Sequence, residues 1–244
     1  MNGSFSPSAS SLDALALQYR AIADNMANSN TAGFKRTVNS FSEQLQKQMM
    51  LHLQHRPETN EVTGVSHRDF SQGTITHTGR TLDVAIEGKG FFVVETAEGP
   101  RYTRNGTFRA DERGKLVDHQ GRPVAGRAGP ITLPRRYAQS KVSIGMDGTI
   151  SVGDRKVGEL KVVEFEDETI LAPEGGSLFR TTDDKAKPVD SETSVVHQGY
   201  RESSNVNTVE ELVNLMQVTK LYDANIKAMK KQDERLGNLI QAAM

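Results

Sequence analysis

The chain has 244 residues, a length that suits one or two domains. Its 30 lysine and arginine residues nearly balance 31 aspartate and glutamate residues. The net charge of −1 therefore gives no bulk electrostatic reason to expect nucleic acid or an anionic membrane as partner. The absence of cysteine excludes disulfides, thiolate zinc sites and a cysteine nucleophile.

The N-terminal residues predict neither a membrane segment nor a classical leader. No apolar run approaches the roughly 18–20 residues that cross a bilayer, so we expect no membrane insertion. Residues 1–11 carry no positive charge and lead into an amphipathic segment, which is not the pattern of a secretory signal peptide. If the protein leaves the cytoplasm, we expect another route.

The first periodic segment predicts an amphipathic helix over residues 12–26, which contain neither glycine nor proline. Ser10 or Ser11 is the expected N-cap, and the turn-forming residues 28–33 are expected to end the helix. Apolar side chains recur every three or four positions and form a narrow N-terminal seam: Leu12, Leu15, Tyr19, Ile22 and Met26.

The C-terminal end repeats this pattern over a greater length. Thr208 and Glu211 have the spacing of a capping box, so the helix is expected to start near Val209. A narrow seam sustained over several heptads is typical of a coiled coil, and a helix packed on its own domain is the alternative. The C-terminal seam comprises Leu212, Leu215, Thr219, Tyr222, Ile226, Met229, Asp233, Leu236, Ile240 and Ala243.

Between these helices, residues 62–200 carry the signals of β-strands. Residues 82–86 alternate apolar with polar or small side chains, residues 91–94 form a buried-strand run, and residues 158–165 predict one further strand. With the end helices, this zone indicates an α+β fold whose central antiparallel β domain is of barrel or sandwich type.

Two dipeptides in the β zone predict hairpins. Asn105-Gly106 is the strongest short hairpin signal, and Asp147-Gly148 is a second one. The expected strand pairs are 102–104 with 107–109 and 142–144 with 149–152.

Residues 34–61 connect the N-terminal helix to the β zone. Apolar residues fall four apart at Phe41, Leu45, Met49 and Leu53, but this face is thin. The segment could be a second short helix, or could become ordered only on contact with another chain.

No group of residues indicates catalysis. His52 and His55 could share a helix face as metal ligands, but no HExxH pattern completes them, and two exposed imidazoles are the simpler interpretation. Gly88-Lys89-Gly90 lacks the third glycine and the helix of a dinucleotide-binding loop, so we expect a turn or bulge. We therefore expect no catalytic residue, metal or cofactor.

The two seams suggest assembly. Each seam is too narrow to be covered by the β domain alone, and the simplest burial pairs the end helices with one another. Their outer positions would then be free to meet neighbouring molecules. A contact that repeats without closing produces a helical filament.

Four separated segments resemble the axial proteins of the bacterial flagellum, specifically the rod and hook proteins. Residues 22–36 (IADNMANSNTAGFKR) are similar to the family's IANNLANxNTxGFKR. Residues 78–92 (TGRTLDVAIEGKGFF) are similar to TGRxLDVAIxGxGFF, followed by residues 102–108 (YTRNGTF), and residues 198–207 (QGYRESSNVN) are similar to QGxLExSNVN. The motif residues are Asn28, Thr31, Gly33, Phe34, Leu82, Asp83, Gly88, Gly90, Phe91, Ser204, Asn205 and Val206.

The resemblance implies a structural subunit of the basal-body rod, the hollow drive shaft that crosses the periplasm from motor to hook. It implies no catalytic activity and no cofactor. Residues 1–33 and 201–244 would form a tube-lining coiled coil, with residues 34–61 as a connecting segment and residues 62–200 as an outer β domain.

The resemblance also implies the partners: other copies of the chain, neighbouring rod and hook proteins, and the flagellar export apparatus, which exports such proteins without a cleaved signal peptide. The chain is most similar to the proximal rod type, with the distal type as runner-up. A different class is an enzyme or secreted binding module on the β domain, dimerised by the helices. That class predicts a concave site with convergent polar or aromatic groups.

Overall fold

The computed structural model describes residues 7–39, 66–134, 142–183, 188–191 and 193–242. The chain divides into two compact units. The helical unit comprises Met1–Ala27, Thr37–Asp69 and Asn207–Met244, and the β unit comprises Asn28–Arg36 and Phe70–Val206. Of the connecting segment 34–61, residues 40–61, with the possible helix and with His52 and His55, lie outside the described residues, whereas residues 37–39 form a strand.

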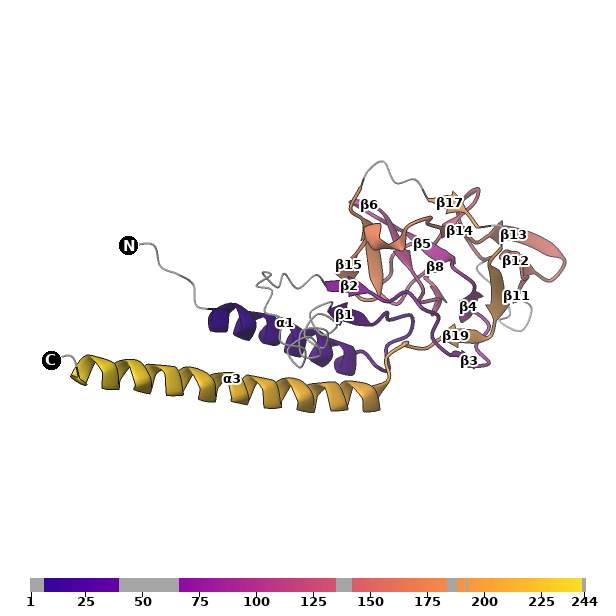
Figure 1. Cartoon of the computed structure of the whole chain (residues 1–244). Coiled ribbons are helices and arrows are strands. Elements are labelled where there is room, and N and C mark those ends of the chain that lie inside the picture. The colour runs from indigo at the N-terminus through magenta and orange to yellow at the C-terminus, as the bar shows by residue number, and fades with distance from the viewer. Residues whose placement is uncertain (1–6, 40–65, 135–141, 184–187, 192, 243–244) are drawn as a thin grey trace. The chain divides into compact units, whose positions relative to one another are not determined.

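In the described part of the helical unit, the helices α1 (Pro7–Ala27) and α3 (Thr208–Ala242) run side by side in opposite directions (Figure 1). The same described part contains two short strands, with β1 (Thr37–Asn39) pairing antiparallel to β2 (Ser66–Arg68). The helices contact each other through a small apolar cluster: Ala14, Leu15, Ile22, Met26, Leu215, Val218 and Leu221.

The N-terminal caps of both helices differ from the prediction, whereas α1 ends at Ala27, directly before residues 28–33, as predicted. Helix α1 starts at Pro7, a position that proline tolerates, so the expected N-cap at Ser10 or Ser11 is wrong. The start of α3 agrees with the prediction, but its cap is Asn207, whose Oδ1 accepts from the backbone N–H groups of Val209 at 3.1 Å and Glu210 at 3.4 Å. The predicted capping box fails because the Glu211 side chain is buried elsewhere in the helical unit.

The β unit is antiparallel throughout the strand pairs that the structure describes. Its largest sheet has the order β15-β16-β6-β5-β14-β17, next to a three-stranded sheet β11-β12-β13 and two-stranded pairs. The α+β class is confirmed, but these described strands form open sheets, so the barrel expectation is wrong. The strands are β3 (Ile75–His77), β4 (Val84–Glu87), β5 (Phe91–Thr96), β6 (Gly99–Thr103), β7 (Arg109–Ala110), β8 (Leu116–Val117), β9 (Ala125–Gly126), β10 (Gly129–Pro130), β11 (Val142–Ile144), β12 (Thr149–Val152), β13 (Arg155–Glu159), β14 (Val162–Glu164), β15 (Leu171–Gly175), β16 (Leu178–Thr181), β17 (Val189–Asp190), β18 (Val195–Gln198) and β19 (Tyr200–Glu202).

One of the two predicted hairpins is formed. Strands β11 and β12 pair around the Asp147-Gly148 turn, where Gly148 has φ +80°. The Asn105-Gly106 hairpin is wrong, because β6 pairs with β5 and β16 while β7 pairs with β8. Gly106 is instead packed against Val84, whose backbone N–H donates to the Gly106 carbonyl at 2.9 Å. A Cβ on Gly106 would lie 1.8 Å from the Val84 oxygen.

The predicted strand over residues 158–165 is divided. Strand β13 ends at Glu159 and β14 begins at Val162, so a single strand over this range is wrong. Leu160, between them, forms an isolated bridge to Gly126 and lies in the core.

Strand β5 separates the two apolar clusters of the β unit. Phe92 belongs to the larger cluster, and Phe91 and Val93 belong to the smaller one. Successive side chains of a strand point to opposite faces, so both faces of β5 are covered. This confirms the buried-strand interpretation of residues 91–94. Within the described part of the chain, no helix has the length and hydropathy needed to cross a membrane.

Candidate functional site: two polar clusters and a helix pair

A buried ion pair joins the first and last segments of the β unit. Lys35 Nζ lies 2.7 Å from Glu202 Oε1, and both side chains are 0% exposed. Lys35 also donates to the Ser71 carbonyl at 2.6 Å, and the Gly73 N–H donates to the same Glu202 oxygen at 2.9 Å. A buried charge is tolerated when it is paired and hydrogen-bonded in this way.

Arg104 brings a second cation to Glu202. Its Nη1 lies 3.7 Å from Glu202 Oε2 and donates to the Gly88 carbonyl at 2.7 Å. The guanidinium lies 4.6 Å from the centre of the Phe91 ring. Burial lowers the pKa of Arg104, and the Glu202 carboxylate opposes that shift. The motif arginine therefore packs inside the β unit.

Further hydrogen bonds link the motif segments 28–36 and 198–207. The Gly33 N–H donates to the Glu202 carbonyl at 2.9 Å, and the Arg36 N–H donates to Asn205 Oδ1 at 2.7 Å. Gly33 has φ +66°, and a Cβ there would lie 2.4 Å from the Asn105 nitrogen. Only glycine satisfies both conditions.

The other motif residues shape turns and the core. Thr31 donates from its N–H to the Asn28 carbonyl at 3.0 Å. Gly88 has φ +118° in the turn before β5, which confirms the predicted turn. Gly90 leaves space for Val162, whose Cγ1 would lie 2.5 Å from an added Cβ. The remaining members are Phe34, Leu82, Asp83 and Phe91, all buried, and Ser204 and Val206, which are half-buried.

In the helical unit, Asn25 forms a second buried polar cluster. Its Nδ2 donates to the Thr37 carbonyl at 2.9 Å, and its Oδ1 accepts from the Thr37 N–H at 2.8 Å. The Asn25 side chain thus bonds to the start of β1 as a neighbouring strand would. Nδ2 also donates to Glu211 Oε1 at 3.0 Å, so one amide links α1, β1 and α3.

Replacing Asn25 by alanine is expected to lower the free energy of unfolding of the helical unit by about 1–3 kcal/mol, because it leaves the Glu211 carboxylate and the Thr37 backbone buried without these partners. Urea unfolding followed by the helical circular dichroism signal measures the change. Asn238→Ala, on the exposed surface of α3, is the matched control. Equal losses for the two variants would contradict this role of Asn25.

The predicted seams are distributed over several environments. Leu15 and Ile22 are buried between the helices, whereas Tyr19, Leu212 and Tyr222 are exposed. The side chains of Leu236 and Ile240 lie outside the described set, and the role of the seams in assembly stays a prediction. The half-buried seam residues are Leu12, Met26, Leu215, Ile226 and Met229.

Sequence reasoning placed Leu215 in the seam but missed the other residues of the contact face of α3. Glu211 and Val218 are both buried there, and Leu221 packs beside them. Glu211 and Val218 are seven positions apart, which is the spacing of one heptad. Glu211 was not recognised as part of this face because a charged residue is not counted in an apolar pattern. Lys35, Arg104 and Glu202 lay inside the recognised motifs without being singled out.

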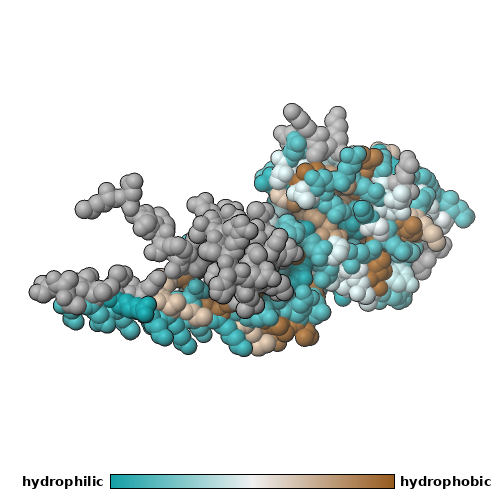
Figure 2. Space-filling view, viewed as in Figure 1, coloured by the Kyte–Doolittle hydropathy of each residue, from teal (hydrophilic) through white to brown (hydrophobic). Residues whose placement is uncertain are grey.

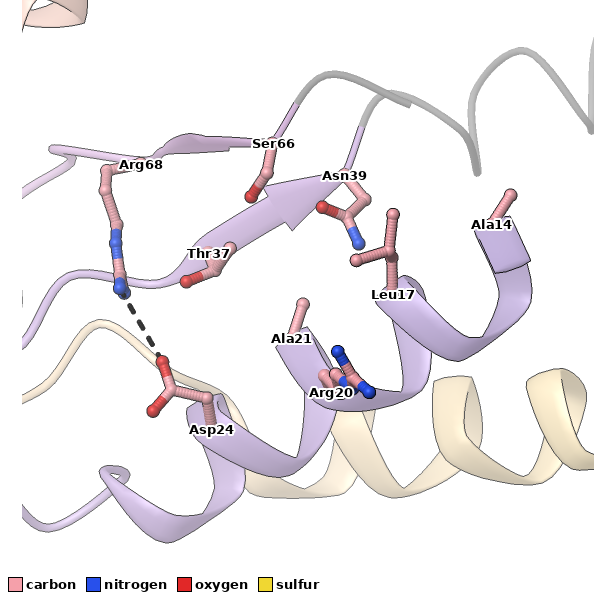
Figure 3. Close-up of a pocket in the computed structure, with 9 residues that line it drawn as sticks. All are labelled: Ala14, Leu17, Arg20, Ala21, Asp24, Thr37, Asn39, Ser66 and Arg68. Atoms are coloured by element: carbon pink, nitrogen blue, oxygen red, sulfur yellow. Dashed lines mark ion pairs between the residues drawn. The ribbon is translucent and has the colours of Figure 1, made fainter. Parts of the chain in front are cut away.

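Two hollows lie among the described residues of the helical unit. One, of about 280 Å³, lies between α1 and the β1–β2 pair and is lined by Leu17, Asn39 and Ser66 among others (Figure 3). An ion pair between Asp24 and Arg68, 3.6 Å apart, lies at its edge. Burial lowers the pKa of Arg68, and Asp24 opposes the shift. The other hollow, about 440 Å³, lies between α1 and α3. Among the described residues, no group of His, Asp and Glu side chains could hold a metal ion.

Two family models match the chain. The model described as flagellar hook protein FlgE/F/G D1 domain matches residues 85–152, and the model described as flagellar basal body rod FlgEFG protein C-terminal matches residues 197–242. Both describe components of the flagellar rod and hook.

Relatives extend the match to almost the whole chain. The flagellar basal-body rod protein FlgG of Buchnera aphidicola subsp. Schizaphis graminum is 33% identical, over 94% of this chain and 95% of that protein. The corresponding FlgF proteins of Caulobacter vibrioides and Salmonella typhimurium are 36% and 32% identical, over 89% and 92% of this chain and 91% of each relative. The chain belongs to the flagellar basal-body rod protein family, a family of structural subunits, which confirms the resemblance of the motifs.

Proposed function

We propose that the chain polymerises through its helical unit into the hollow shaft that transmits torque from the flagellar motor to the hook. The observation that carries this proposal is apolar surface on the paired helices that their mutual contact leaves exposed. Leu17, Tyr19 and Tyr222 are each more than two-fifths exposed. In a member of the rod family, neighbouring subunits are the natural cover for such a surface.

The helices and the β unit have separate tasks in this proposal. Residues 1–33 and 201–244 pair as a coiled coil that lines the tube, and residues 62–200 form the outer wall. The partners are further copies and the adjacent rod and hook proteins. The chain reaches the basal body through the flagellar export apparatus, without a cleaved signal peptide.

Within the rod we propose the proximal position. The support is the 36% identity to the Caulobacter vibrioides FlgF protein; the Buchnera FlgG protein and the Salmonella typhimurium FlgF protein are 33% and 32% identical. Electron microscopy of basal bodies, with an epitope tag in this chain, locates it along the shaft. Label next to the hook would favour the distal position instead.

Deleting the gene for this chain is expected to abolish swimming and to leave basal bodies without a complete rod, and expression of the intact chain is expected to restore both. Motility assays and electron microscopy of purified basal bodies measure these effects. A secreted binding module would leave the rods intact, and that result would refute the proposal.

A further inference from the structure

The Asn105-Gly106 dipeptide does not form the hairpin that its sequence predicts, but it has a second chemical property. The side-chain amide of an asparagine is open to attack by the backbone nitrogen of a following glycine, because glycine has no side chain that hinders the approach. The sequence contains this dipeptide at Asn2-Gly3 and at Asn105-Gly106. Asn2-Gly3 lies outside the described residues, whereas Asn105 is half-buried and Gly106 is buried in the β unit.

The reaction open to this dipeptide is spontaneous deamidation. The Gly106 nitrogen loses its proton and bonds to Asn105 Cγ, while the bond from Cγ to Nδ2 breaks and ammonia leaves. The product is a five-membered succinimide ring, which water opens at one of its two carbonyl groups. One opening produces aspartate. The other produces isoaspartate, in which the backbone runs through the former side chain and is longer by one carbon.

Hydrogen bonds hold the peptide groups on both sides of Asn105. The Asn105 N–H donates to Thr103 Oγ1 at 3.0 Å, and the Gly106 carbonyl accepts from the Val84 N–H at 2.9 Å. The side chain is held as well, since Asn105 Oδ1 accepts from the Thr107 N–H at 3.0 Å. Ring closure requires rotation about the Asn105 backbone to bring the Gly106 nitrogen to Cγ. Because this rotation breaks these hydrogen bonds, the folded backbone opposes the reaction.

Close packing restrains the dipeptide from two sides. A Cβ on Gly33 would lie 2.4 Å from the Asn105 nitrogen, so the first motif segment lies directly against this peptide group. Gly106 packs against Val84 and against the Phe92 ring, whose Cε2 would lie 2.8 Å from an added Cβ. Hydrophilic residues are frequent on the face of the β unit that Figure 2 shows, so water surrounds the unit and this packing separates Gly106 from it.

We propose that Asn105-Gly106 is a deamidation site that the fold protects, in part through the first motif segment, residues 28–36. The inference is independent of the proposed function, because it rests on the packing of the β unit alone. A chain that forms isoaspartate before it folds has an extra backbone carbon at a point where Gly33 and Val84 leave no room for it. The unfolded chain is therefore the vulnerable form, and folding prevents the reaction.

The protection depends on contacts that are distant in the sequence. Residues 28–36 are held by the Lys35–Glu202 ion pair at 2.7 Å and by the Gly33 N–H, which donates to the Glu202 carbonyl at 2.9 Å. Replacing Lys35 by alanine removes the ion pair but none of the hydrogen bonds of Asn105. The Lys35→Ala chain is therefore expected to deamidate faster at Asn105 than the intact chain.

Mass spectrometry of the purified full-length chain tests the proposal. Folded chain and chain unfolded in guanidinium chloride are kept in the same mildly alkaline buffer, and the peptide that contains Asn105 is followed as its amide becomes a carboxyl group. Asn2-Gly3 is the reference for the rate of the same dipeptide in the denaturant. Asn105→Asp identifies the aspartate product and distinguishes it from isoaspartate. Lys89→Ala, at an exposed position, is the matched control for Lys35→Ala.

In the denaturant, Asn105 is expected to deamidate at a rate similar to that of Asn2. In the folded chain we expect a rate more than about a hundredfold lower, because the reaction then proceeds only through the small population of opened molecules. Lys35→Ala is expected to raise the rate in folded chain about tenfold or more, and Lys89→Ala to leave it unchanged.

Equal rates at Asn105 in the folded and unfolded intact chain would overturn the proposal. A folded Lys35→Ala chain that reacts no faster than Lys89→Ala would overturn the role of residues 28–36 in it. Circular dichroism establishes that each variant is folded before the rates are compared. A Lys35→Ala chain that does not fold is expected to react at the rate seen in the denaturant, and the comparison within the intact chain then decides.

Discussion

Replacing Lys35 by alanine is expected to lower the free energy of unfolding of the β unit by about 3–5 kcal/mol, the cost of removing one partner of a buried ion pair. The loss is large because Glu202 stays fully buried, with Arg104 3.7 Å away as its remaining cation. Urea unfolding of the full-length chain, with hydrogen exchange to locate the change, measures the effect. Lys89→Ala, at an exposed position, is the matched control and is expected to change stability by less than about 0.5 kcal/mol.

A double substitution distinguishes two contributions to this loss: the attraction between Lys35 and Glu202, and the cost of leaving one buried charge without its partner. The variant with Lys35→Met and Glu202→Leu removes both charges, so it is expected to be less destabilised than the sum of the two single variants. The lost hydrogen bonds to Ser71 and Gly73, and the loss of the Glu202 carboxylate beside the buried Arg104, will keep part of the cost. Strictly additive losses would show that the two side chains act independently.

Replacing Phe92 by alanine is expected to lower the free energy of unfolding by about 3–5 kcal/mol, the range for truncating a buried phenylalanine. Phe92 is fully buried in the larger apolar cluster, and its ring centre lies 5.1 Å from that of Phe108. Truncation leaves a cavity and removes an edge-to-face aromatic contact.

Thermal unfolding followed by circular dichroism measures this loss, with Met146→Ala as the control at a side chain that is 72% exposed. The Phe92 variant is expected to melt well below the control. A smaller loss than that of the control would mean that β5 is not central to the stability of the unit.

The periodicity of the sequence predicted both helices and part of the face by which they meet, namely Leu15, Ile22 and Met26 on α1 and Leu215 on α3, but it also placed exposed residues in the same seams. The apolar spacing suggested that Leu212 and Tyr222 turn inward. In the structure Glu211 is buried in their place, because the Asn25 amide compensates its carboxylate. The spacing of apolar residues cannot predict the burial of a polar residue whose hydrogen-bond partner lies 186 positions away in the chain.

In the β unit, a turn dipeptide predicted a hairpin correctly only where the tertiary packing allows the two flanking strands to pair. The Asp147-Gly148 turn folds as its dipeptide predicts. Asn105-Gly106 has a similar preference, but close packing of Gly106 on Val84 separates the flanking strands. The ion pair of Lys35 and Glu202 had no local signal, and only the family motifs indicated that their segments mattered.

The Lys35–Glu202 pair also constrains the order of folding. Its two residues are 167 positions apart, so the β unit cannot complete this contact until nearly the whole polypeptide is present. Synthesis delivers the amino end first, and closing so long a loop is entropically costly and slow. In the nascent chain, Lys35 therefore cannot form its ion pair until residue 202 has been synthesised.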